Sequence, residues 1–225
     1  VVKLPGLQIN FEKQYVDVEA EICIERGALE LIACTPGTKE HESIVTVAAR
    51  PMHIHTALLL LGLKNGHPAQ RRPINEEKTR WVFLPPRGQL VEVSLVIQDN
   101  RGEGLEFPIS DFVTHTDGAD AFAPEPVEPV EGPEFPGAFI FAGSVLHETE
   151  EGEQVYIADR SGHVITVSTF GDELLCLPEV VSQDNQALLW KVDTTALPEV
   201  GTKVTLRLRP HEEGEEAGPG RMRPE

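Results

Sequence analysis

The sequence predicts an α+β chain that is predominantly β, with antiparallel sheets packed in a sandwich-like arrangement and one buried helix near residues 51–63. Residues 14–25 alternate between apolar and polar side chains, which is typical of a strand buried on one face. Most other apolar residues fall in short runs bounded by glycine, proline, aspartate or asparagine, a pattern that favours strands. One segment has the length and the end signals of a helix.

The N-terminal elements are expected to begin with a β-hairpin. Residues 14–25 form its first strand, a turn follows at 26–27, and residues 28–33 form its second strand. A loop over residues 34–42 then leads to a short strand at 43–48. The strands at 14–25 and 28–33 are therefore predicted to pair with each other.

The one predicted helix covers residues 51–63. Pro51 stands where a first helical turn accepts proline, and Gly62, followed by Asn65 and Gly66, supplies the stop. Apolar residues cover most of the helix circumference, so we expect the helix to be buried on several sides.

The remaining elements are predicted to be strands. They cover residues 79–84, 90–98, 104–109, 138–146, 154–158, 163–169, 173–177, 188–192 and 203–208. Residues 99–102 are expected to form the hairpin turn between two of these strands, and residues 159–162 form another turn. No second helix is predicted.

The charge of the chain is strongly acidic and unevenly distributed. There are 37 acidic residues against 19 lysines and arginines, a net charge of -18. Residues 117–136 hold six acidic residues, five prolines and no base, and the tail 210–225 holds five acidic residues and two bases. We expect a single β-rich domain over residues 1–209, with an acidic, proline-rich loop at 117–136 and a disordered acidic tail at 210–225. The net charge opposes binding to nucleic acid or to anionic lipid.

The longest apolar run, around residues 58–61, is too short for a transmembrane segment. The three cysteines Cys23, Cys34 and Cys176 allow at most one disulfide. The first residue is Val1, so an N-terminal segment is expected to have been removed.

One part of the sequence concentrates residues that bind metals. Between positions 34 and 67 lie one cysteine and four of the eight histidines: Cys34, His41, His53, His55 and His67. Zinc prefers sulfur and imidazole ligands, although the spacing here matches no established motif. His53 and His55 would point about 200° apart on a helix, so at most one of them joins such a site. The favoured alternative is structural, with one histidine bonded to neighbouring backbone and the other on the surface.

Two further interpretations concern the loop over residues 34–42. A nucleophilic site would use Cys34 as thiolate, His41 as base, and Glu40 or Glu42 as the orienting acid. Because no helix N-terminus is predicted at Cys34 to lower its pKa, a buried structural thiol is favoured over catalysis. The same loop could instead be an exposed binding loop held by strands.

Several segments resemble a known family. Residues 29–43, LELIACTPGTKEHES, and Pro51 followed by residues 54–63, IHTALLLLGL, are similar to the most specific blocks of the bacterial YdjY-like domain family. Residues 141–144 and 156–162 are similar as well. The resemblance implies one domain over nearly the whole chain. It singles out four residues as candidates for binding: Lys39, His41, Glu42 and His55.

The resemblance also bears on cofactors and location. Some relatives are associated with ferredoxin-type iron–sulfur segments, but three scattered cysteines cannot ligate such a cluster, so none is expected. Other relatives are similar to exported or lipid-anchored proteins. This implies an extracytoplasmic location, periplasmic, secreted or lipid-anchored, once an N-terminal segment has been removed.

The sequence thus favours a non-catalytic binding or structural module of the bacterial cell envelope, with a protein or small molecule as its partner. The alternative is a zinc or iron protein whose metal site uses His41, Glu42 and His55, with Cys34 nearby.

Overall fold

The computed structural model describes residues 1–75, 77–99, 101–116, 134–179 and 189–211. Most of the predicted acidic loop and nearly all of the predicted tail lie outside these residues. No helix in the described ranges is both long enough and apolar enough to span a membrane.

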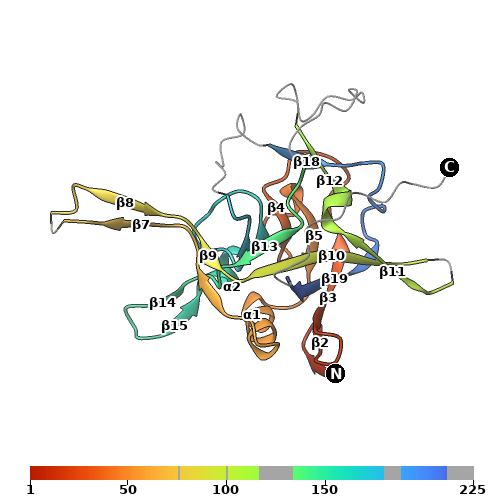
Figure 1. Ribbon diagram of the computed structural model, residues 1–225, viewed down its shortest axis with the longest axis horizontal. Coiled ribbons are helices and arrows are strands. Elements are labelled where there is room, and N and C mark those ends of the chain that lie inside the picture. The colour runs from red at the N-terminus through yellow and green to blue at the C-terminus, as the bar shows by residue number, and fades with distance from the viewer. Residues whose placement is uncertain (76, 100, 117–133, 180–188, 212–225) are drawn as a thin grey trace.

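The main sheet is a closed eight-stranded barrel (Figure 1). Around the ring the strands are β3 (Tyr15–Ile22), β19 (Lys203–Pro210), β10 (Leu90–Gln98), β13 (Ala138–Phe141), β17 (Leu175–Cys176), β16 (His163–Thr166), β4 (Leu31–Cys34) and β5 (Ser43–Val47). The pairing of β3 with β5 closes the ring. Neighbouring strands are antiparallel except for β4 with β5 and β16 with β17.

Smaller elements extend or decorate the barrel. Its sheet is extended by β1 (Val2–Leu4), β2 (Leu7–Asn10) and β11 (Gly104–Pro108). Eight further strands pair two by two into small sheets: β12 (Val113–His115) with β18 (Trp190–Val192), β14 (Leu146–Glu148) with β15 (Gln154–Tyr156), β6 (Asn65–His67) with β9 (Arg87–Gly88), and β7 (Gln70–Pro73) with β8 (Trp81–Leu84). The helices are η1 (Glu40–Glu42), α1 (Pro51–Leu60), η2 (Ile109–Phe112) and α2 (Ile157–Ser161).

The predicted β-rich class is confirmed, but the predicted sandwich is wrong. After β4 the chain crosses over through residues 35–42 and returns as β5, parallel to β4. Strand β5 then occupies part of the edge of β3, whose other part pairs with β2. This joins the two sheet edges that a sandwich would leave open.

The same crossover corrects the predicted N-terminal hairpin. The alternating strand at 14–25 is confirmed as β3, but its neighbours are β2, β5 and β19 rather than β4. Strand β4 pairs instead with β5 and β16. By contrast, the predicted hairpin of β10 and β11 is confirmed.

Side chains fill the barrel, as expected for eight strands. Alternate residues of β19, such as Leu206 and Leu208, are fully buried together with Val16 and Val18 of β3. The largest fully buried side chains include those of Phe139 and Phe141 on β13. The barrel interior is therefore a packed core.

Helix α1 begins at the predicted Pro51 but ends at Leu60, and it lies at the surface against β3 and α2. Ile54, Ala57 and Leu58 are fully buried, whereas Leu59 and Leu60 are 45% and 53% exposed. The expected burial on several sides is wrong, because the barrel covers one side of this helix and the opposite side faces outward.

The predicted turn at 159–162 is also wrong in part, since most of it belongs to the helix α2.

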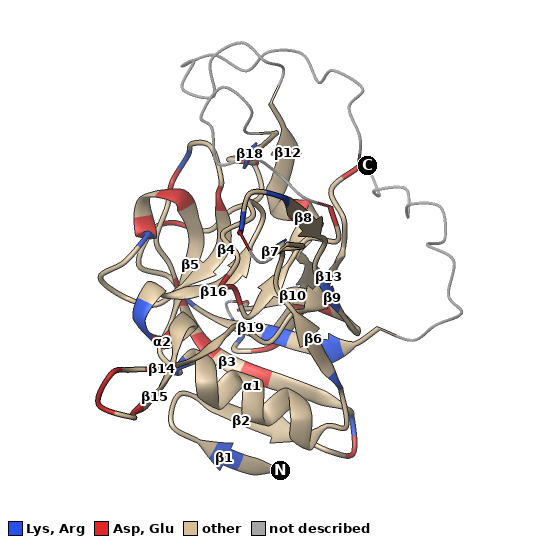
Figure 2. Cartoon of the chain, turned by 90° about the vertical axis from the view of Figure 1, so that its left-hand side faces the viewer, with Lys and Arg blue, Asp and Glu red and all other residues tan. Residues whose placement is uncertain are grey.

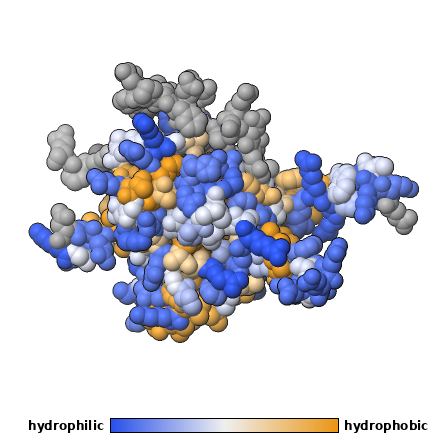
Figure 3. Space-filling view, turned by 180° about the vertical axis from the view of Figure 1, so that it is seen from behind, coloured by the Kyte–Doolittle hydropathy of each residue, from blue (hydrophilic) through white to orange (hydrophobic). Residues whose placement is uncertain are grey.

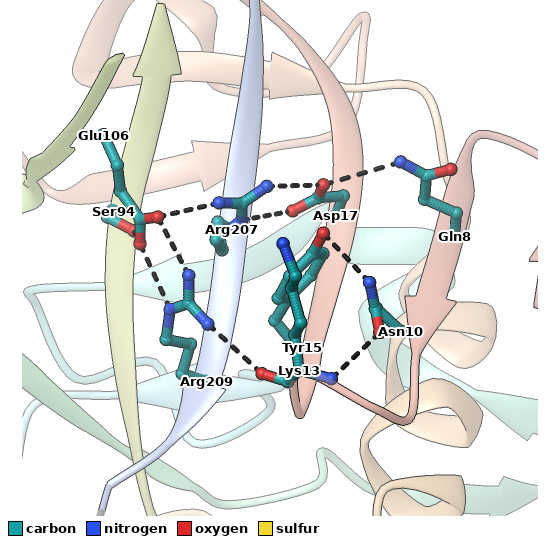
Figure 4. Close-up of polar contacts among 9 residues, drawn as sticks. All are labelled: Gln8, Asn10, Lys13, Tyr15, Asp17, Ser94, Glu106, Arg207 and Arg209. Atoms are coloured by element: carbon teal, nitrogen blue, oxygen red, sulfur yellow. Dashed lines mark hydrogen bonds and ion pairs between the residues drawn. The ribbon is translucent and has the colours of Figure 1, made fainter. Parts of the chain in front are cut away.

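A charged network ties the outer face of the sheet together (Figure 4). Arg207 on β19 binds Asp17 on β3 through two bonds of 2.7 and 2.8 Å, and Glu106 on β11 at 2.7 Å. Its guanidinium lies 4.0 Å from the centre of the Tyr15 ring. Burial acts to raise the pKa of Glu106, but hydrogen bonds from Arg209, Ser94 and Arg207 lower it to about 2.

We predict that Arg207→Met lowers the free energy of unfolding by about 3 kcal/mol, because it leaves the buried carboxylate of Asp17 without its partner. Urea titration at pH 7 measures this. The matched control is Lys203→Met, which breaks a largely exposed pair with Glu21 on the same two strands and should change nothing measurable. Equal losses in the two variants would contradict the importance of the buried pair.

Candidate functional site

The predicted binding residues Lys39 and Glu42 come together in the crossover, with Glu30 as a third member that the sequence did not reveal. The ammonium nitrogen of Lys39 lies 2.6 Å from Glu30 Oε2 and 2.9 Å from Glu42 Oε2. The side chain of Glu30 is 7% exposed, and that of Lys39 is 30% exposed. We call these three residues the Lys39 cluster.

The electrostatics of the Lys39 cluster are those of a buried structural ion pair. Burial, together with a hydrogen bond with Glu42, raises the pKa of Glu30. Burial acts to lower the pKa of Lys39, but hydrogen bonds with both glutamates raise it above its ordinary value. The lysine is therefore held charged by partners inside the protein.

A second pair lies next to this cluster. His163 Nδ1 is 2.6 Å from Asp172 Oδ1, and the His163 ring packs on Phe170 with centroids 4.1 Å apart. Phe170 also contacts Lys39, whose nitrogen lies 5.1 Å from the ring centre. His163 and Asp172 lie 129 and 138 positions after Cys34 in the chain, so their position near the crossover follows from barrel closure.

Cys34 and His41 occupy different environments. Cys34 is fully buried, and the nearby Cys23 thiol donates to the carbonyl of Ser43 at 3.2 Å. The hydrogen bond with Cys23 lowers the pKa of Cys34 to about 6, although burial acts to raise it. The side chain of His41 is 74% exposed, with Nε2 3.5 Å from Glu42 Oε1. The arrangement therefore offers no geometry for His41 to act as a base on Cys34.

His55 lies in the junction between α1 and α2. Its Nδ1 is 2.8 Å from the hydroxyl of Tyr156, which donates to the carbonyl of Gly143 at 3.0 Å. Its ring also packs edge-on against Phe141 at 4.9 Å. Burial lowers the pKa of His55, so the ring is neutral at pH 7.

The same junction supplies the cap that α1 lacks. Arg50, at the N-cap position, makes no side-chain cap. Instead, Asp159 of α2 accepts the backbone N–H of Met52 at 2.9 Å and pairs with Arg50. A carboxylate at a helix N-terminus satisfies a free N–H group and complements the helix dipole. Asp159 thus ties the two helices together.

The predicted metal ligands are divided between these places. His41 is on η1, Cys34 is buried at the end of β4, and His55 is bonded to Tyr156. Within the described ranges no group of three or more histidine, cysteine, aspartate or glutamate residues is arranged to hold a metal ion. The geometry therefore gives the metal hypothesis no support.

The segments that carry the family resemblance meet at this junction. Gly162, which ends α2 with φ +78°, accepts the N–H of Thr35, and a Cβ on it would lie 2.6 Å from Thr35 Oγ1. Glycine is required there for both reasons. A model of the YdjY domain matches residues 7–209. The chain belongs to the YdjY domain family. No curated protein and no solved structure matches it.

The YdjY domain also has a feature that the sequence analysis missed: an arm, residues 64–88, that stands away from the barrel (Figures 1 and 3). Strands β6 and β9 form its root, and β7 and β8 form the projecting hairpin. A Cβ on Gly66 would lie 2.0 Å from the carbonyl oxygen of Arg87, and one on Gly88 would lie 2.1 Å from that of Phe141. These two glycines let the root pack closely on itself and on β13.

The arm exposes large apolar side chains. Trp81 is 54% exposed and Phe83 is 45% exposed, and Val82 and Ile74 are exposed as well. An open concavity of about 520 Å³ is lined by Arg71, Trp81, Val82 and Phe83. Grouped apolar exposure of this kind is a common feature of protein contact surfaces.

The arm also differs in charge from the rest of the YdjY domain. Residues 64–88 contain six lysines and arginines and two glutamates, a net charge of +4, which leaves -22 for the remainder. Figure 2 shows the contrast with the acidic turn of the β14–β15 hairpin on the same side. A local reversal of charge beside the apolar run 81–84 was the sequence signal that could have identified the arm.

We predict that Lys39→Met lowers the free energy of unfolding at pH 7 by about 2 kcal/mol, because it leaves Glu30 and Glu42 facing each other without a counter-charge. Adding Glu30→Gln should recover part of the loss. Chemical denaturation of the single and double variants measures the coupling. His41→Ala, in the same loop, is the control and should leave stability unchanged; a double variant no more stable than Lys39→Met would contradict the coupling.

We also predict that stability falls as pH drops from about 6.5 towards 5, the range below the ordinary histidine pKa. The pKa of His55 is lower in the folded chain than in the unfolded chain, so the unfolded chain binds a proton first and acid favours unfolding. Thermal unfolding across this range should show a shallower slope for His55→Gln than for wild type. The control is His41→Gln, and an unchanged slope in His55→Gln would refute the assignment.

Proposed function

We propose that this YdjY domain is a non-catalytic binding module that contacts a protein partner through its arm. The half-exposed Trp81 and Phe83 on the β7–β8 hairpin carry this proposal. Tryptophan, other aromatic residues and arginine supply most of the binding energy at protein interfaces. The arm places both aromatic residues beside Arg71 on a structure that reaches beyond the barrel.

The stability of isolated hairpins supports the same proposal. A two-stranded sheet is marginally stable in water unless further strands or a packing surface cover it. The β7–β8 sheet has two strands within the described ranges, and three of the four residues of β8 are exposed. A partner that covers this hairpin would bury Trp81, Val82 and Phe83.

The polar groups elsewhere favour binding over catalysis. Lys39 is engaged by Glu30 and Glu42, and His55 by Tyr156. Pairing of this kind stabilises the fold. The arm, by contrast, presents its apolar and basic side chains outward.

We further propose that the domain acts outside the cytoplasm, in the bacterial cell envelope. The support for this is the resemblance to exported and lipid-anchored relatives. Cell fractionation of the native bacterium, with antibody against the domain, tests the location directly. Recovery of the domain with cytoplasmic markers would refute the proposed location. It would not bear on the proposed role of the arm.

We predict that a photo-crosslinking amino acid at Val82 forms a discrete crosslink to another protein in the native bacterium. The same amino acid at Leu146, which is 60% exposed on the β14–β15 hairpin, is the matched control and should form none. Arg71→Glu with Arg72→Glu should abolish the Val82 crosslink, as read by immunoblot and mass spectrometry. Absence of a crosslink at Val82, or equal crosslinking at both hairpins, would refute the proposal.

A further inference from the structure

The outer edge of β8 is an open strand edge. Strand β8 pairs with β7 on one side, with Trp81 opposite Pro73, Val82 opposite Arg72 and Phe83 opposite Arg71. Within the described ranges no strand pairs with its other side. The edge therefore offers backbone groups to an incoming strand.

The register shows which backbone groups face outward. The N–H of Ile74 donates to the carbonyl of Arg80 at 3.0 Å, so this facing pair is hydrogen-bonded. Such pairs alternate along an antiparallel ladder. The pair of Val82 with Arg72 is then hydrogen-bonded, whereas Trp81 and Phe83 direct their N–H and C=O groups to the open edge. Pro73 fits this register, because the position opposite Trp81 needs no N–H.

The two edges of the hairpin are not equivalent. On β7 the outward positions are those of Arg71 and Pro73, and proline has no N–H to donate, which blocks strand addition there. Strand β8 has no proline, and its sequence, WVFL, favours β structure. One edge is thus protected and the other is open.

The charge of the arm selects among possible occupants. A second arm carries the same net charge of +4, so like charges oppose pairing of two β8 edges. The turn at the tip contains the charged residues Glu77 and Lys78, which oppose insertion into a bilayer. With a net charge of +4, the arm is complementary to an acidic protein segment.

We infer that the outer edge of β8 accepts an extended acidic segment of a partner protein as a third strand. Main-chain bonds from Trp81 and Phe83 would supply affinity, and the neighbouring arginines would select acidic side chains. This inference rests on the proposed binding function of the arm and adds the mode of binding and the chemistry of the partner.

The test is selection from a displayed library of random 12-residue peptides on the intact domain. Selected peptides are then measured against Phe83→Pro, which removes an outward N–H and leaves the inward bonds of Val82. The matched control is Phe83→Thr, which removes the ring but keeps the N–H. Hydrogen exchange at Val82 confirms that the hairpin persists in both variants.

We expect the selected peptides to combine acidic residues with alternating apolar ones. Their affinity should fall at least tenfold in Phe83→Pro, which is about 1.4 kcal/mol, and clearly less in Phe83→Thr. The double variant Arg71→Glu with Arg72→Glu should also lower the affinity of the peptides, and this loss should be larger at low salt than at high salt.

Three outcomes would overturn the inference. Peptides whose binding depends on Trp81, but whose affinity for Phe83→Pro equals their affinity for wild type, would refute strand addition while leaving the binding function intact. A concentration-dependent dimer of the domain alone, abolished by Phe83→Pro in sedimentation, would assign the edge to a second copy. Failure to select any peptide that depends on the arm would refute strand addition, and the crosslinking experiment at Val82 would decide the binding function separately.

Discussion

The crossover over residues 35–42 is the constraint on which the rest of the structure depends. It reverses the chain so that β5 runs parallel to β4 and reaches the edge of β3. Lys39 holds it in place through Glu30, at the start of β4, and Glu42, at the start of β5. Charges that are largely removed from water thus stabilise this short segment in the path that barrel closure requires.

Local patterns predicted individual strands well and their partners poorly. The alternation at 14–25 identifies β3 because burial on one face leaves a period of two, and it cannot identify its neighbours. The pairing of β3 with β5 and β19 depends on contacts between distant segments. Helix α1 was misjudged for a related reason: the apolar composition of Leu59 and Leu60 does not say which side the barrel covers.

For the candidate site, sequence reasoning found the residues of the crossover and missed what surrounds them. Lys39 and Glu42 are three positions apart, so their contact follows from local geometry. Glu30 and Phe170 join them through tertiary structure. His55 belongs to a different junction, which closes only when Tyr156 and Asp159 pack against α1. The arm could not be identified from the run 81–84 alone, because WVFL is equally typical of a strand inside a core.

The pairing of β3 with β19 has a consequence for how this domain is made. The second strand of the barrel ring, residues 203–210, lies almost at the end of the described chain, yet it sits beside residues 15–22. During synthesis, the ribosome must release the chain as far as residue 210 before the ring can form. Until then the edge of β3 that pairs with β19 stays open, so folding is expected to be slow and largely post-translational, and the unfinished chain needs protection from aggregation.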